Sequence, residues 1–160
     1  MERQEGRDYF DKARTVAAAL LFGAGIAAVG GAFLEWVTIQ PPERVPADQA
    51  NRLDAFTGMD TSDGWVVVAL AGAILLSALF LVIRKRSLYA WIAFWCSMVM
   101  GGISIADYRG IDELFYEEMN RIGDPSPAFG LTLVAVAALV GIVASVTGVA
   151  ASPKRDEEQP

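Results

Sequence analysis

Charged residues are absent from four stretches of the chain, each about twenty residues long or longer. These stretches cover residues 15–34, 64–83, 87–106 and 127–152. A hydrocarbon core about 30 Å thick takes roughly 20 helical residues to cross. The pattern therefore predicts four transmembrane helices. An uninterrupted apolar run over residues 15–34 is also too long for the core of an ordinary cleaved signal peptide, which favours a retained helix.

The polar segments between and beyond these stretches complete the predicted architecture. Two long loops cover residues 35–63 and 107–126, and polar tails that we expect to be flexible cover residues 1–8 and 153–160. The connection over residues 84–86 is so short that the second and third helices must form an antiparallel hairpin. We expect one all-α domain over residues 1–160, an up-down-up-down four-helix bundle. Whether its two hairpins arose by duplication stays open.

Lysine and arginine are distributed unequally between the two sides of the predicted membrane. The segments before the first stretch and after the fourth, together with the short turn, carry nine of the 13 cations, including Lys12 and Arg14, and the two long loops carry four. Because cytoplasmic segments are enriched in these residues, both termini and the turn are predicted to be cytoplasmic. Each long loop carries six carboxylates against two arginines. The expected location is therefore the plasma (inner) membrane of a bacterium, with two acidic loops on the outer side.

Both outer loops contain patterned segments. In the second loop, apolar residues recur at helical spacing and predict an amphipathic helix; they are Ile111, Leu114, Phe115, Met119 and Ile122. In the first loop, residues 36–40 favour an extended segment, and residues 48–56 a short helical piece. Asp60, Ser62 or Asp63 could cap the second helix, and Ser126 followed by Pro127 is a good start for the fourth.

The composition excludes several kinds of active site. Hydrophobic residues make up 54% of the chain, histidine is absent and Cys96 is the only cysteine. Histidine-containing triads, histidine–cysteine metal sites and internal disulfides are therefore excluded. Residues that carry a charge at neutral pH are absent from the four predicted spans, although transport pathways usually need them. We predict no catalytic residues, no cofactor, no metal and no nucleic-acid partner.

Small residues recur at four-residue spacing in every predicted helix. The first helix carries Gly23, Ala27 and Gly31 in one row, and the fourth carries Gly141 within another. Helices in lipid associate largely through close packing at such small residues. The rows serve either packing within the bundle or, for the first helix, contact with a partner as well. Both interpretations remain open at this point.

The outer end of the first helix carries a carboxylate and an aromatic residue side by side. Glu35 is expected to be solvated, to pair with Arg109 or Arg52, or to contact a cation of a partner. Trp36 is expected to anchor the helix at the membrane interface, where tryptophan is enriched. Acidic residues elsewhere in the loops do not match the spacing of an EF-hand. A solvated acidic surface is the simplest interpretation of them.

Two short motifs carry a resemblance to a known group of proteins. They are Phe33-Leu34-Glu35-Trp36-Val37 at the end of the first helix and Asp63-Gly64-Trp65 at the start of the second. The first hairpin and the general topology, roughly half the chain, resemble small four-helix membrane proteins of unknown function from actinobacteria. The resemblance brings no catalytic residues with it. It implies a role in the cell envelope, as an accessory subunit of lipid-uptake or other envelope transport complexes.

Together these features favour a non-enzymatic accessory or regulatory subunit of a larger plasma-membrane complex, one that handles envelope lipids or solutes. Its partners would be the lipid bilayer and other integral membrane subunits. The alternative is a homo-oligomeric pore or a membrane protein that binds lipid or another small molecule. The candidate packing or partner surface comprises Gly23, Ala27, Gly31, Glu35, Trp36, Phe115, Met119 and Gly141.

Overall fold

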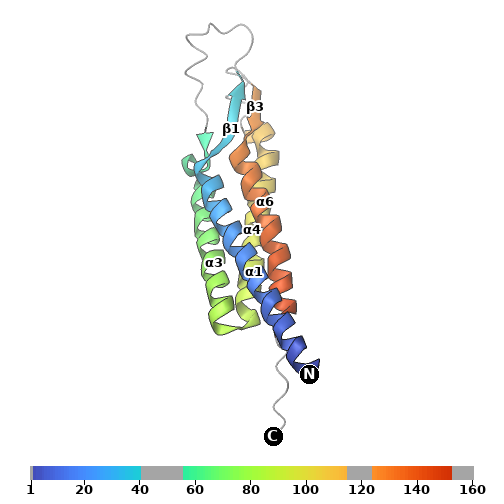
Figure 1. Cartoon of the computed structure of the whole chain (residues 1–160). Coiled ribbons are helices and arrows are strands. Elements are labelled where there is room, and N and C mark those ends of the chain that lie inside the picture. Colours follow the sequence, from blue (N-terminus) through green and yellow to red (C-terminus); the bar gives the residue numbers. More distant parts are fainter. Residues whose placement is uncertain (1, 41–55, 115–123, 153–160) are drawn as a thin grey trace.

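The computed structural model describes residues 2–40, 56–114 and 124–152 and shows an elongated helical bundle with a small sheet at one end (Figure 1). Within these residues the long helices are α1 (Glu2–Phe33), α3 (Ser62–Arg84), α4 (Ser87–Leu114) and α6 (Phe129–Ala150). Each of these four contains a segment long and apolar enough to cross a membrane. The prediction of a mainly helical protein with four helices long and apolar enough to span a membrane is confirmed at this level.

The helices form a closed ring in which each one packs against two neighbours. α1 contacts α3 and α6, and α4 contacts the same two helices from the opposite side. The start of α1, the end of α6 and the turn between α3 and α4 lie at one end of the bundle (Figure 1). We call this the termini end, and the opposite end, which carries the sheet, the sheet end.

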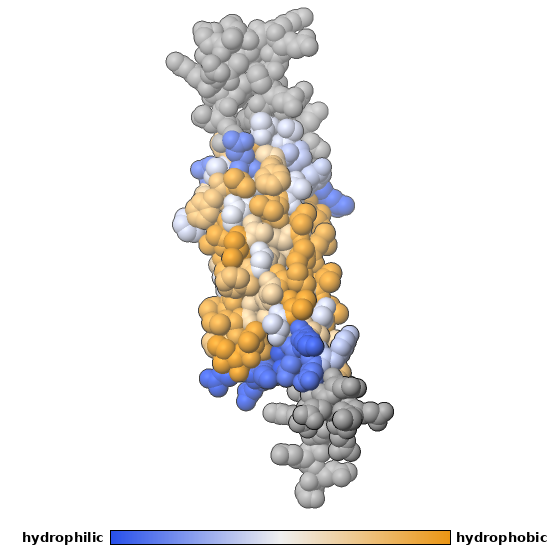
Figure 2. All heavy atoms as spheres, in the orientation of Figure 1, coloured by the Kyte–Doolittle hydropathy of each residue, from blue (hydrophilic) through white to orange (hydrophobic). Residues whose placement is uncertain are grey.

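Small side chains fill most of the interior of the bundle. On α1, Ala24, Ala28 and Ala32 are buried, and they lie on the row beside the one that contains Gly23. Larger core residues include Leu21, Ile74 and Met100. Many large apolar side chains instead cover the outside of the bundle, where Figure 2 shows a hydrophobic belt between polar ends. This inverted distribution is what a helical bundle in lipid requires, because the solvent around it is itself apolar.

The helices differ from the predicted spans mainly at their polar ends. α1 begins at Glu2 and not near Thr15, so most of the expected flexible tail over residues 1–8 is helical. α4 continues past Ala106 to Leu114 and includes the start of the expected amphipathic segment. The rest of that segment lies outside the described residues. A span ends where charge begins, whereas a helix ends only where its backbone hydrogen bonds are interrupted.

A three-stranded antiparallel sheet caps the bundle, with strand order β2-β1-β3. Its strands are β1 (Glu35–Gln40), β2 (Phe56–Thr57) and β3 (Asp124–Pro127). The extended conformation predicted for residues 36–40 is present in β1. The helical piece expected over residues 48–56 falls outside the described residues except at Phe56, which lies in β2. The sheet brings the two long loops together, which the sequence analysis did not foresee.

The ends of two helices differ from the predicted caps. Thr61 is the N-cap of α3, and its hydroxyl accepts a hydrogen bond from the Gly64 N–H at 3.3 Å. The candidates Ser62 and Asp63 lie inside the helix, and Asp60 ends a short 3-10 helix, η1 (Gly58–Asp60). α6 begins at Phe129, because Ser126 and Pro127 belong to β3. At the other end of α3, Lys85 has a left-handed backbone (φ 50°) and closes the helix.

Candidate functional site

The sheet end is organised around the buried side chain of Trp36. Its exposure is 3%, and its indole Nε1–H donates a hydrogen bond to the Gly31 carbonyl oxygen at 2.9 Å. Gly58 lies so close that a Cβ there would be 2.6 Å from the indole Nε1 and 2.7 Å from the Ala32 carbonyl oxygen. The prediction that Trp36 is an interfacial anchor is therefore wrong. Its ring instead fixes the entry of β1 into the cap.

The chain around β3, at the end of the second outer loop, attaches to the same strand through two hydrogen bonds, one from a backbone amide and one from a side chain. The Ala128 N–H donates to the Trp36 carbonyl oxygen at 2.8 Å, and the Ser126 hydroxyl donates to the Thr38 carbonyl oxygen at 3.2 Å. β3 lies at an edge of the sheet, where its two prolines remove no hydrogen bond from a neighbouring strand. The cap is therefore a tied structure in which residues from both loops are held at fixed positions.

Acidic side chains are concentrated at the sheet end. Asp63 in the first turn of α3 faces Asp107 on α4, and the Asp107 Oδ2 atom is buried without a hydrogen-bond partner among the described residues. Glu35 is exposed and makes no ion pair with Arg109; Arg52 lies outside the described residues. Within the described residues, no group of three histidine, cysteine or acidic side chains could hold a metal ion. The two carboxylates alone give no defined chemistry.

Asp60 stabilises the turn that leads from β2 into α3. Its carboxylate Oδ2 accepts hydrogen bonds from the Thr57 hydroxyl and the Thr57 N–H, both at 2.8 Å. These two hydrogen bonds lower the pKa of Asp60 below its ordinary value, because both donors favour the charged form. The hydroxyl of Thr57 has the larger effect and its N–H the smaller one. The contact is therefore complete above the ordinary pKa of an aspartate and is lost only as the pH falls through the lowered one.

The termini end is held by a buried arginine. One guanidinium nitrogen of Arg14 bonds to Asp11 Oδ1 at 3.0 Å, and another donates to the Ala151 carbonyl oxygen at 2.9 Å. The arginine side chain is only 6% exposed. Lys85, in the turn between α3 and α4, reaches the same Asp11 oxygen at 3.4 Å. These contacts tie the start of the α1 span to the end of α6 and to the α3–α4 turn.

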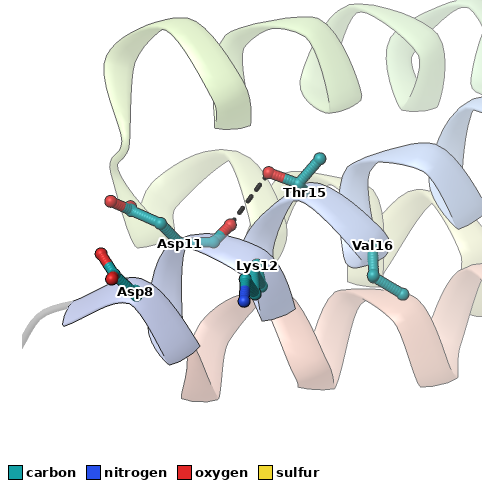
Figure 3. A pocket seen from close by; sticks show the side chains of 5 residues that line it. All are labelled: Asp8, Asp11, Lys12, Thr15 and Val16. Carbon is teal, nitrogen blue, oxygen red and sulfur yellow. Dashed lines mark hydrogen bonds between the residues drawn. The ribbon is translucent and has the colours of Figure 1, made fainter. Parts of the chain in front are cut away.

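A shallow hollow with both charged and apolar side chains in its lining lies beside this network on α1. Figure 3 shows its lining, in which the Thr15 hydroxyl donates to the Asp11 carbonyl oxygen at 2.9 Å. The hollow has a volume of about 550 Å³, and its lining residues are Asp8, Asp11, Lys12, Thr15 and Val16. Among the described residues, Asp8 and Lys12 make no ion pair. The charged part of the lining therefore comprises Asp11, which is paired, and Asp8 and Lys12, which have no ion pair among the described side chains.

An apolar groove of about 540 Å³ continues from the same place along α1 and α3. The α1 side of the groove comprises Thr15, Ala18, Ala19 and Phe22, and the α3 side comprises Leu75, Leu76, Ala78, Leu79 and Val82. Thr15 borders both the hollow and the groove. Neither feature is among the sites predicted from the sequence. Their signal in the sequence is a recurrence of residues 8, 11, 12, 15, 19 and 22 on one face of a helix.

The predicted row of small residues on α1 divides between the interior and the outside. Gly31 is buried against α6, where an added Cβ would lie 2.8 Å from the Val134 Cγ2 atom. Ala27 is half-buried, and Gly23 is exposed with no atom near the position of a Cβ. Ala19 and Gly30 are also exposed. A stripe of small residues, which we call the α1 stripe, therefore comprises Ala19, Gly23 and Gly30, which are exposed, and Ala27, which is half-buried.

The remaining candidate residues lie elsewhere. Gly141 is buried on α6 against Ser97 of α4, whose Cβ atom would be 3.1 Å from a Cβ at position 141. Phe115 and Met119 lie outside the described residues. Comparison with protein-family models, curated proteins and solved structures gives no match to the chain. Inference about function therefore rests on the bundle itself.

Proposed function

We propose that the protein is a non-enzymatic accessory or regulatory subunit of a larger plasma-membrane complex that handles envelope lipids or solutes. One observation carries this proposal: the α1 stripe is mostly uncovered although the opposite face of the same helix is fully packed. Ala24, Ala28 and Ala32 are buried inside the bundle, whereas Gly23 and Gly30 have no neighbour at the position of a Cβ.

The α1 stripe has the properties of a surface for another transmembrane helix. Apolar burial does not drive helices together in lipid, so association depends on close packing. Glycine and alanine allow two backbones to approach, and a lipid chain gains little from such a flat stripe. Exposed large side chains, such as Ile26 at 55% exposure, flank the stripe and would interdigitate with a partner helix. A partner subunit would therefore cover α1 along its length.

The proposal includes an orientation with both termini in the cytoplasm. The described side chains at the termini end include five cations and two carboxylates, whereas those at the sheet end include Arg109 and four carboxylates. Positive charge is retained on the cytoplasmic side during insertion. The cap formed by the sheet would then face outward, where its acidic residues are solvated.

Cysteine labelling tests this orientation. Ser87 and Asp60 are exposed at opposite ends of the bundle, and each would be replaced by cysteine in a Cys96→Ser background. We expect a membrane-impermeant maleimide to label intact spheroplasts at position 60 only, and to label position 87 after the membrane is opened. Labelling of position 87 in intact spheroplasts would overturn the orientation.

A partner test uses three glycines at which an added Cβ would have no neighbour. The double variant Gly23→Leu, Gly30→Leu places bulk on the α1 stripe, and Gly102→Leu places it on α4, where a Cβ also has no neighbour. After extraction in mild detergent, we expect the wild type and Gly102→Leu to retain a larger integral subunit. The amount of this subunit that co-purifies with the double variant should fall at least about tenfold, because the backbones of α1 and the partner helix can no longer approach each other.

The outcomes of this experiment separate the possible surfaces. Release by Phe115→Ser, Met119→Ser, with retention by the glycine variant, would move the recognition surface to the second outer loop. A wild-type protein recovered only as copies of itself would contradict the accessory role and favour the homo-oligomeric alternative. Native mass spectrometry of the purified material distinguishes these cases.

A further inference from the structure

Two carboxyl groups face each other where the α3–α4 hairpin reaches the sheet end. Asp63 lies in the first turn of α3, and Asp107 lies on α4, one residue beyond the charge-free stretch that ends at Ala106. The two side chains are within reach of a hydrogen bond, and the Asp107 Oδ2 atom is buried without a partner among the described residues. Ionised carboxylates only accept hydrogen bonds, and they repel each other. This contact is therefore attractive only when one of the two groups carries a proton.

No described cation neutralises the pair. The other charged or titratable side chains described at this end are Glu35 on β1, Asp60 on η1, and Tyr108 and Arg109 on α4 itself. Arg109 is exposed and forms no ion pair among the described residues, and the Asp60 carboxylate is bonded to Thr57. Burying a carboxylate oxygen with neither a cation nor a donor is costly, and the neutral acid avoids this cost.

The two helices treat their carboxyl groups differently. Asp63 belongs to the first turn of α3, where the free N–H groups and the helix dipole stabilise a negative charge. Asp107 lies well inside α4, which continues to Leu114, and has no helix N-terminus beside it. Its Oδ2 atom is also the buried one. The proton therefore belongs on Asp107, and the charge belongs on Asp63.

We propose that Asp107 donates a shared proton to Asp63, and that this hydrogen bond is a pH-sensitive latch between α3 and α4 at the sheet end. The pair defines neither a catalytic site nor a metal site, and its chemistry is the uptake and release of one proton. Loss of the proton leaves two like charges facing each other, so the end of α4 moves away from the start of α3. In the proposed orientation the latch would respond to the pH outside the cell. The latch itself depends neither on that orientation nor on a partner subunit.

The composition of the chain makes this proton unusually easy to detect. Aspartate and glutamate side chains of an unfolded chain are ionised above about pH 5. Histidine, which ordinarily titrates near neutral pH, is absent. In this range the folded chain would bind one more proton than the unfolded chain, so its stability must fall as the pH rises.

Unfolding of the full chain in mixed micelles, followed by circular dichroism at increasing pH, tests the proposal. The unfolding equilibrium constant of the wild type should rise by up to about tenfold per pH unit above about pH 5, until the folded chain loses the proton. Asp107→Asn and Asp63→Asn each supply an amide donor in place of the proton, and should remove this dependence. Glu35→Gln removes an exposed carboxylate from the same end and should retain it.

Two further measurements separate the proton from the movement. An infrared difference spectrum between the wild type and Asp107→Asn at about pH 5.5 should contain the C=O stretching band of a protonated carboxylic acid, and one between the wild type and Glu35→Gln should not. Spin labels at the exposed positions Ser62 and Tyr108, in a Cys96→Ser background, report the distance between the two helices. The labels should move apart as the pH rises, and should not do so when Asp107→Asn is added.

Four results would overturn the inference. The first is a wild-type stability that does not change with pH above about pH 5. The second is an undiminished pH dependence in Asp107→Asn, which would place the proton elsewhere. The third is a proton transition without a change in the distance between the labels, because the pair would then not act as a latch. The fourth is a stability that rises with pH in the presence of Mg²⁺ and no longer does so in Asp107→Asn, which would show that two ionised carboxylates bind a cation. Failure of the partner test on the α1 stripe would leave all of these measurements unaffected.

Discussion

Gly31→Leu is expected to destabilise the bundle by about 3 kcal/mol or more. An added Cβ at this position would lie 2.8 Å from the Val134 Cγ2 atom and 2.9 Å from the Gly130 carbonyl oxygen. The second contact is with backbone, so α1 and α6 must separate to admit the side chain. Overpacking a tight core by much smaller additions already costs about 1–3 kcal/mol. The same separation would also disturb the Gly31 carbonyl that accepts the Trp36 hydrogen bond.

The matched control for this variant lies on the same helix. Gly23→Leu adds the same side chain at a position where a Cβ has no neighbour, and the intrinsic helix propensities involved are the same. Unfolding in mixed micelles, followed by circular dichroism, gives the free-energy difference for each variant. Gly31→Leu should unfold at a lower fraction of denaturing detergent, and Gly23→Leu should remain close to the wild type. Equal stability of the two would contradict the observed packing of α1 on α6.

The spans could be predicted from the sequence because each one depends only on local composition. A run without charge must be buried in lipid wherever its neighbours lie, so the apolar parts of the four helices follow from the chain alone. The sheet could not be predicted in this way. Its β1–β3 pairing joins Val37 to Pro127 and Gln40 to Asp124 across most of the sequence. Pairing over such separations depends on tertiary structure and leaves little local pattern, and the two prolines of β3 argued against a strand.

The candidate residues show the same limit at the level of single side chains. Spacing correctly placed Gly31 and Gly23 on one row, but the burial of one and the exposure of the other depend on the angle between α1 and its neighbours. Trp36 was misassigned because an aromatic residue at a span boundary usually lies at the membrane interface. Its burial depends on Gly58, which approaches from the other end of the first outer loop. From the sequence, Arg14 is predicted only to be one of the cytoplasmic cations. Its hydrogen bond to the Ala151 carbonyl oxygen joins residues 137 positions apart and leaves no local pattern.

Arg14→Met is expected to destabilise the termini end by about 2–3 kcal/mol. The methionine preserves much of the apolar stem but removes the donor to the Ala151 carbonyl oxygen and the ion pair with Asp11. Removing one partner of a buried hydrogen bond costs about 1–3 kcal/mol. The ion pair adds less, because Asp11 is 55% exposed and also contacts Lys85. We expect α1 and α6 to separate first at this end, since Ala151 lies directly beyond the last residue of α6.

Arg86→Met separates this effect from a change in membrane insertion. It removes one cation from the same end of the bundle, and Arg86 is exposed with no side-chain partner among the described residues. Hydrogen exchange of the backbone amides at the end of α6, including that of Ala151, should accelerate in Arg14→Met but not in Arg86→Met. Arg14→Lys should lie between them, because a single ammonium cannot reach both acceptors as the guanidinium fork does. Equal exchange in the two methionine variants would mean that Arg14 contributes only its charge, and that the contact with Ala151 does not hold α1 to α6.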